Sequence, residues 1–163
     1  MKKIFLLLAL SLLFTMCKSK KTYIDSTGNT VTVTKRPDVQ YRDDFKSVPA
    51  AQRDRLLKSM KATGKDYSVL IFTKEYKGEK ITVTSNGKAI FTGNLISNLK
   101  TGIAEKTRIY NTTDTKVYDA LTQKEVIIEA AEAQKHKFIY LLKNPADKEQ
   151  PFMITYSNTL RPL

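Results

Sequence analysis

Hydrophobic and polar residues alternate with a period of two along much of the chain. The segment 80–84 shows this clearly, because polar residues separate Ile81 from Val83. Such alternation places successive side chains on opposite faces and predicts a strand with one buried face. Other short strand candidates, alternating or continuously apolar, are 68–73, 89–93, 104–110, 115–120, 125–130, 137–142 and 152–157. We therefore predict about eight short strands in this part of the chain.

The residues between these segments favour turns. Asn86-Gly87 is a pair typical of tight hairpins, and residues 76–79 are expected to form another turn. Short strands separated by turns at this spacing predict a sandwich or a barrel. We expect a mainly β fold, an antiparallel β-sandwich with an immunoglobulin-like pattern. The chain has no Trp and a single cysteine, so it lacks the markers of the immunoglobulin family itself.

Three segments outside this series carry other signals. Residues 48–62 are expected to form one short α-helix, because Pro49 suits a first turn and the leucines fall on one side. Such a helix either packs over a sheet or lies on a membrane, and we expect it to pack. The Ala-Glu-rich segment 129–134 predicts a further helical turn. Residues 22–35 predict a hairpin that either joins the main fold or stands apart.

The N-terminus has the three parts of a secretory signal. Met1-Lys2-Lys3 is positive, residues 4–14 are apolar except for Ser11, and Thr15-Met16-Cys17 follow as the site of cleavage. A permanent spanning helix needs about 20 apolar residues, so this run is too short for one. The alternatives are a buried N-terminal helix, or plain secretion with cleavage near Ser19.

Cys17, the only cysteine, follows the apolar run directly. Residues 1–17 resemble the signal peptide of bacterial lipoproteins, although Phe14 and Met16 depart from its commonest residues. The resemblance implies a signal peptide at 1–16, a lipid on the Cys17 sulfur and a tether at 17–22. The tether lysines, which are Lys18, Lys20 and Lys21, would then lie at the lipid headgroups. Because no aspartate follows Cys17, the resemblance also implies an outer-membrane protein. The tether has no acidic cluster of the kind that resembles a surface-export tag, which favours the periplasmic face.

Length and charge limit what the mature chain can do. The full sequence has 163 residues, a length that suits one domain, which we place at 23–163. The chain has 28 basic and 16 acidic residues, so loss of Lys2 and Lys3 leaves a net charge of +10. This charge favours anionic partners such as lipid headgroups or an anionic glycan. An envelope protein is the other expected partner. Nucleic acid is not expected behind an export signal.

The sequence has few candidates for catalytic or metal-binding residues. We predict no catalytic residue, no cofactor and no metal site, because the single histidine, His136, lacks partners at compatible spacing and is expected to face solvent. Two acid pairs, Glu125 with Glu129 and Asp43 with Asp44, could serve a glycosidase but are expected to be surface acids. The aromatic residues are expected to fill the core.

These observations predict a membrane-anchored lipoprotein that acts as a non-catalytic binding or envelope-assembly module. The alternatives are a glycan-binding accessory or a glycan-directed hydrolase of the cell envelope, and a purely structural envelope protein.

Overall fold

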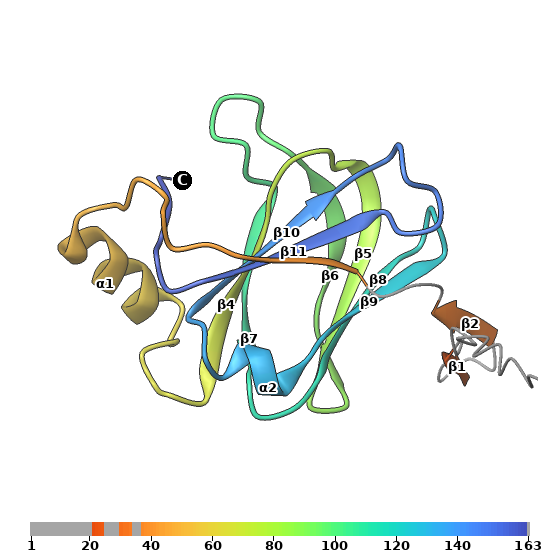
Figure 1. Ribbon diagram of the computed structural model, residues 1–163, viewed down its shortest axis with the longest axis horizontal. Coiled ribbons are helices and arrows are strands. Elements are labelled where there is room, and N and C mark those ends of the chain that lie inside the picture. The colour runs from red at the N-terminus through yellow and green to blue at the C-terminus, as the bar shows by residue number, and fades with distance from the viewer. Residues whose placement is uncertain (1–20, 25–29, 34–36, 163) are drawn as a thin grey trace, which may run out of the picture.

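A computed structural model describes residues 21–24, 30–33 and 37–162. Two β-sheets lie face to face, with one helix at the outer side of the larger sheet (Figure 1). The predicted hairpin near 22–35 is present as β1 (Lys21–Ile24) and β2 (Thr30–Val33), which pair antiparallel in a two-stranded sheet of their own. The predicted signal peptide, Cys17, Lys18 and Lys20 lie outside the described residues.

The smaller sheet is antiparallel throughout and has the strand order β6-β5-β8-β9. Its hairpin between β5 and β6 turns at Asn86 and Gly87, whose φ angles are 51° and 69°. Two successive positive φ angles match the twist of the strands, which is why Asn-Gly is favoured here. The predicted hairpin is therefore confirmed. The bounds are β5 Lys77–Ser85, β6 Lys88–Ile96, β8 Thr115–Asp119 and β9 Lys124–Ile128.

The larger sheet has the order β3-β11-β10-β4-β7 and is mixed. Neighbours β10/β11 and β4/β7 are antiparallel, whereas β10/β4 and β11/β3 are parallel. The mainly β sandwich is confirmed, but the expectation of antiparallel pairing is wrong for these two pairs. Parallel partners are joined by long connections, so no local turn reveals their direction. The bounds are β3 Asp38–Tyr41, β4 Tyr67–Phe72, β7 Glu105–Tyr110, β10 Phe138–Lys143 and β11 Phe152–Ser157.

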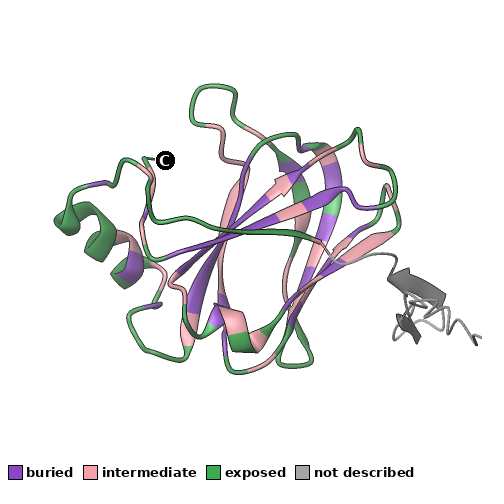
Figure 2. Cartoon of the chain, viewed as in Figure 1, coloured by how far each residue is buried: buried purple, intermediate pink, exposed green. Residues whose placement is uncertain are grey.

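The core lies between the two sheets, where buried residues follow the facing strands (Figure 2). Alternate positions of β5 point inward, with Ile81 and Val83 fully buried. Leu70 and Phe72 of β4 meet them from the larger sheet. Full burial of each such side chain contributes about 1.5–3 kcal/mol, so the interior of the sandwich is the main source of stability.

The outer face of the larger sheet has its own apolar layer. Helix α1 (Ala50–Ser59) packs Leu57 over Val69 and Ile71 of β4. Because β4 is covered on both faces, its residues 69–72 are continuously apolar rather than alternating. The predicted packed helix is thus confirmed, with Pro49 at its N-cap. Helix α2 (Ala130–Ala133) confirms the predicted single helical turn.

One predicted turn is instead part of a strand. Residues 77–79 open β5, and Gly78 has φ 113° at a register shift between Lys77 and Glu79. A shift of this kind is a β-bulge, which bends the strand and re-aims the next side chain. Gly is suited to this position because its φ is unfavourable for other residues.

Asp43 fastens the end of β11 to the segment after β3. Its Oδ1 accepts hydrogen bonds from the N–H of Asn158 (2.6 Å), the hydroxyl of Ser157 (2.9 Å) and the N–H of Thr159 (3.2 Å). These bonds, led by that of Asn158, lower the pKa of Asp43 although burial opposes them. The ionised carboxylate therefore favours the folded state.

We expect Asp43→Asn to lower the melting temperature at pH 7 by about 5 °C. A carboxylate with a lowered pKa stabilises the fold above its unfolded pKa of about 4, and this stabilisation is lost as the pH falls through its folded pKa. The difference should therefore shrink in acid. Thermal unfolding followed by circular dichroism between pH 3 and pH 7 checks it. Asp44→Asn, which loses only an exposed contact with Arg42, is the control and should change little. Equal changes in melting temperature for the two substitutions would contradict the stabilising role given to the Asp43 carboxylate.

Candidate functional site: a buried ion cluster beside an open hollow

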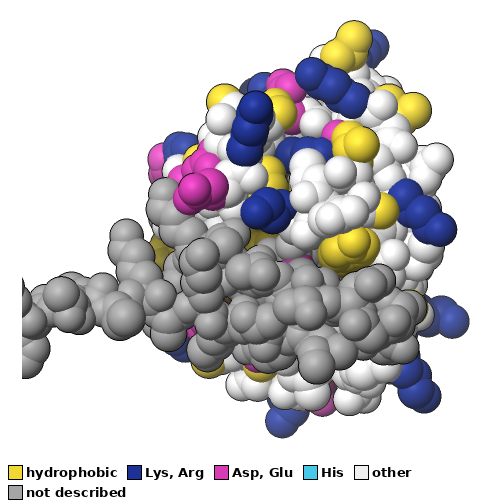
Figure 3. Space-filling model, turned by 90° about the vertical axis from the view of Figure 1, so that its right-hand side faces the viewer, with side chains coloured by type: hydrophobic (Ala, Val, Ile, Leu, Met, Phe, Trp, Pro, Cys, Tyr) yellow, Lys and Arg dark blue, Asp and Glu magenta, His cyan; other side chains and the backbone are white. Residues whose placement is uncertain are grey.

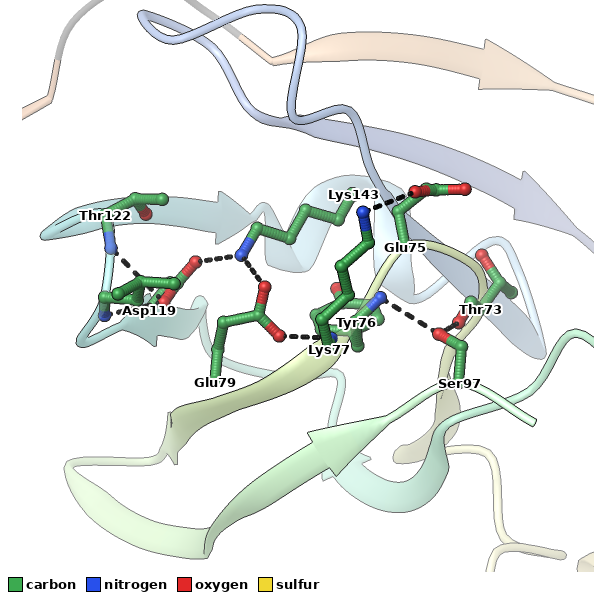
Figure 4. A network of polar contacts seen from close by, with 10 residues as sticks. Thr73, Glu75, Tyr76, Lys77, Glu79, Ser97, Asp119, Thr122 and Lys143 are labelled. Carbon is green, nitrogen blue, oxygen red and sulfur yellow. Dashed lines mark hydrogen bonds and ion pairs between the residues drawn. The ribbon is translucent and has the colours of Figure 1, made fainter. Parts of the chain in front are cut away.

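Three charged side chains meet between the two sheets at one end of the sandwich (Figure 4). Lys143 is the last residue of β10, in the larger sheet. Its Nζ lies 2.5 Å from Oε1 of Glu79 and 2.8 Å from Oδ2 of Asp119. Both acids belong to the smaller sheet, to β5 and β8. The cluster therefore joins the two sheets.

Local backbone geometry brings these residues together. The bulge at Gly78 precedes Glu79, and β5 pairs with β8 so that Ile81 lies opposite Asp119. The exposed fraction is 8% for Glu79, 0% for Asp119 and 3% for Lys143. Charged groups are almost never this buried unless they are paired, so the three side chains depend on one another.

Backbone N–H groups hold the carboxylate oxygens that face away from the amine. Oε2 of Glu79 accepts the N–H of Lys77 at 2.5 Å. Oδ1 of Asp119 accepts the N–H of Leu121 at 2.9 Å and that of Thr122 at 3.4 Å. Each acid therefore has one oxygen on the backbone and the other on Lys143, which fixes the orientation of both carboxylates.

The charged forms stabilise one another. Burial opposes ionisation of Glu79, but the hydrogen bonds from Lys143 and from the Lys77 N–H outweigh it and lower the pKa of Glu79. Burial likewise opposes the charge on Lys143, yet its bonds to Asp119 and Glu79 raise the pKa of the amine. As it stands, the cluster is an ion triad with a net charge of −1.

Tyr76 closes one side of the cluster. Its side chain is 2% exposed and its ring packs edge-on against Phe72, with the ring centroids 5.6 Å apart. The hydroxyl makes no hydrogen bond to any described residue. Burial, followed by the charges of Asp119 and Glu79, raises the pKa of Tyr76 well above its ordinary value. The environment of the cluster is therefore dry on this side.

An open hollow of about 790 Å³ lies on the other side of Glu79 and Lys143. Its exposed cations are Lys77, Lys80 and Lys148, and Leu121, whose exposed fraction is 72%, adds an apolar surface. Lys and Arg side chains are scattered over the visible part of this end of the molecule, with hydrophobic and some acidic side chains among them (Figure 3). The remaining lining residues are Gly78, Ala120, Thr122, Pro145, Asp147 and Pro151.

The histidine lies away from this site. His136 is half-buried rather than solvent-facing, just before β10. Its Nδ1 is 2.9 Å from the carbonyl oxygen of Glu132, and its ring contacts the rings of Tyr41 and Tyr156. These contacts indicate a packing role, in place of the predicted exposed position.

Neither acid pair considered from the sequence lines the hollow. Glu125 forms an ion pair with Lys116 at 3.1 Å, and Glu129 is exposed before α2. Asp43 is bound by the end of β11, as described above. The acids that do meet, Glu79 and Asp119, are 40 residues apart in the sequence and were not singled out as candidates from it.

Comparisons with models of protein families and with curated proteins find no match for this chain. Within the part of the chain that the structure describes, neither helix is long and apolar enough to cross a membrane. No three acidic, histidine or cysteine side chains among those residues are arranged to hold a metal ion.

Proposed function

We propose that this protein is a membrane-anchored lipoprotein whose β-sandwich binds an anionic envelope ligand without catalysis. Acylation of Cys17 would attach it, and the hollow beside the ion cluster would take the ligand. The supporting observation is that three exposed lysines and the exposed side chain of Leu121 line one hollow. Anionic groups on a lipid or glycan would meet the lysines, while apolar parts would lie on Leu121.

The position of the hollow suits this role. Strand β3 begins at Asp38, which pairs with Met153 near the start of β11, and Pro151 lines the hollow. The chain therefore enters the sandwich at the end that carries the hollow. A lipid anchor upstream would hold this end near the membrane surface, where anionic headgroups and envelope glycans are concentrated.

The alternative of a glycan-directed hydrolase has less support. A glycosidase needs a carboxylic acid that stays protonated near neutral pH and a second carboxylate across the scissile bond. The pKa of Glu79 is lowered rather than raised, and Lys143 occupies the space between Glu79 and Asp119. The cluster therefore favours binding over acid catalysis.

A binding experiment on the full chain, extracted from membranes in detergent, tests the proposal. The ligands are a phosphorylated dextran and an unphosphorylated dextran of the same length. We expect binding to the phosphorylated polymer, weakened by salt. Replacing Lys77, Lys80 and Lys148 by Gln should weaken it about tenfold, because each exposed ionic contact contributes about 0.2–1 kcal/mol.

A second triple variant controls for net charge. Replacing Lys58, Lys88 and Lys100 by Gln removes the same charge from exposed positions outside the hollow. This variant should bind within about twofold of the unmodified chain, since only long-range attraction changes. Equal weakening by both triple variants, or equal binding of the two dextrans, would refute the hollow as the binding place.

A further inference from the structure

The ion cluster brings an amine and a carboxylate together in the arrangement of an amide-forming reaction. We propose that Lys143 and Asp119 condense into an intramolecular isopeptide bond, with Glu79 as the proton shuttle. This modification is separate from ligand binding at the hollow. It rests on three features of the cluster, which are contact distance, burial and the hydrogen bonds of the two acids.

Proximity and burial favour the reaction. Nζ of Lys143 is held 2.8 Å from Oδ2 of Asp119, so the reacting groups are already in contact. Holding two reactants in this way replaces a bimolecular encounter by an intramolecular step. The rate of amide formation rises strongly as a result. Proton transfer from the ammonium to a carboxylate turns two charges into none. At rest the charged forms prevail, so the neutral pair is the minor, reactive form of the cluster. Burial beside Tyr76 lowers the cost of forming this neutral pair relative to water.

The hydrogen bonds assign different roles to the two acids. Oδ1 of Asp119 accepts two backbone N–H groups, from Leu121 and Thr122. Paired N–H donors of this kind stabilise the negative charge that develops on a carbonyl oxygen under attack. Glu79 has one N–H on its Oε2 and presents Oε1 to the amine at 2.5 Å. Asp119 therefore supplies the carbonyl, and Glu79 moves protons.

The reaction balances without a co-reactant. One proton passes from the Lys143 ammonium to Oδ2 of Asp119, which leaves a neutral amine beside a carboxylic acid. The Nζ lone pair attacks Cγ, and the charge on Oδ1 is stabilised by the two N–H groups. Glu79 takes a second proton from Nζ and delivers it to Oδ2, which leaves as water as the C–O bond breaks. The third hydrogen stays on the amide nitrogen, and Glu79 ends as a carboxylate.

The intact mass of the full chain tests whether the isopeptide bond forms. Protein extracted from membranes should be lighter by one water, about 18 Da, than its sequence and lipids require. Trypsin should fail to cut after the acylated Lys143. Digestion of the denatured protein should then release a branched peptide that joins residues 117–124 to residues 138–148. Fragmentation of this peptide places the link on Asp119 or elsewhere.

Three variants complete the test. Lys143→Arg keeps a cation but lacks the primary amine, so it should show neither the water loss nor the branched peptide. Asp119→Ala should abolish both as well. Glu79→Gln keeps the shape of the shuttle without its basicity and should leave most of the protein unlinked. An unlinked wild-type chain, or a water loss that persists in Lys143→Arg, would overturn the proposal. A branched peptide containing residues 78–80 would overturn the choice of Asp119, and full linkage in Glu79→Gln would overturn the shuttle.

Discussion

Lys143→Met is expected to lower the free energy of unfolding by at least about 3–5 kcal/mol, the usual cost of removing one partner from a buried ion pair. The reason is that Glu79 and Asp119 would remain between the sheets without a cation, with exposed fractions of 8% and 0%. An isopeptide bond would add to this loss, because it closes the loop from residue 119 to residue 143 in the unfolded chain. Urea denaturation at pH 7 measures the difference.

A neutral version of the cluster separates charge from packing. Lys143→Met combined with Glu79→Gln and Asp119→Asn keeps similar volumes and hydrogen-bonding groups but leaves no buried charge. This triple variant should recover much of the stability that Lys143→Met loses through unpaired buried charge, but not the contribution of an isopeptide bond, which it cannot form. A single variant within about 1 kcal/mol of wild type would show that the cluster does not hold the sheets together.

Cys17→Ser is expected to move the protein from the membrane fraction to the soluble fraction almost completely. Two or more acyl chains hold a protein stably on a bilayer, whereas tether lysines contribute only about 1 kcal/mol each. Fractionation of cells that express each form, followed by intact mass, measures the change. The wild-type protein should lack residues 1–16 and carry added lipid mass, and both features should depend on Cys17.

The matched control keeps the cysteine and removes the charges. Replacing Lys18, Lys20 and Lys21 by Gln should leave most of the protein in the membrane fraction, because the lipid remains. Release of this variant to the same extent as Cys17→Ser would mean that electrostatic attraction holds the protein. A soluble wild-type chain that starts near Lys18 would contradict lipidation.

The strands of the sandwich were largely predictable because each is a local pattern. Alternation around Ile81 and Val83 depends only on neighbouring residues, as does the Asn86-Gly87 turn. Edge strand β3 was missed, because it has only four residues, all of them exposed, and the alternation of Val39 and Tyr41 with polar residues is too short to predict a strand. The parallel pairs were missed for a different reason, since their partners are far apart in the sequence.

The ion cluster was not predictable by the same means. Lys143 ends an apolar strand and Asp119 ends an alternating one, where charged residues are normally exposed. Only the stacking of the two sheets turns these strand ends toward each other. The sequence predicted a simple turn at 76–79, and this prediction did not include the bulge at Gly78 that precedes Glu79. The one available signal was that Asp119 falls on the same face of its alternating strand as the buried Val117.

The parallel pairing of β3 with β11 also determines how the domain would bear a mechanical load. A pull on the chain upstream of Asp38 acts along β3, whose hydrogen bonds to β11 lie across the direction of force. Those bonds would have to shear together, whereas an antiparallel hairpin pulled from its open end yields one pair at a time. A domain that is anchored at its N-terminal end while a bound ligand pulls on it would therefore resist extension at β3, the first strand of the larger sheet.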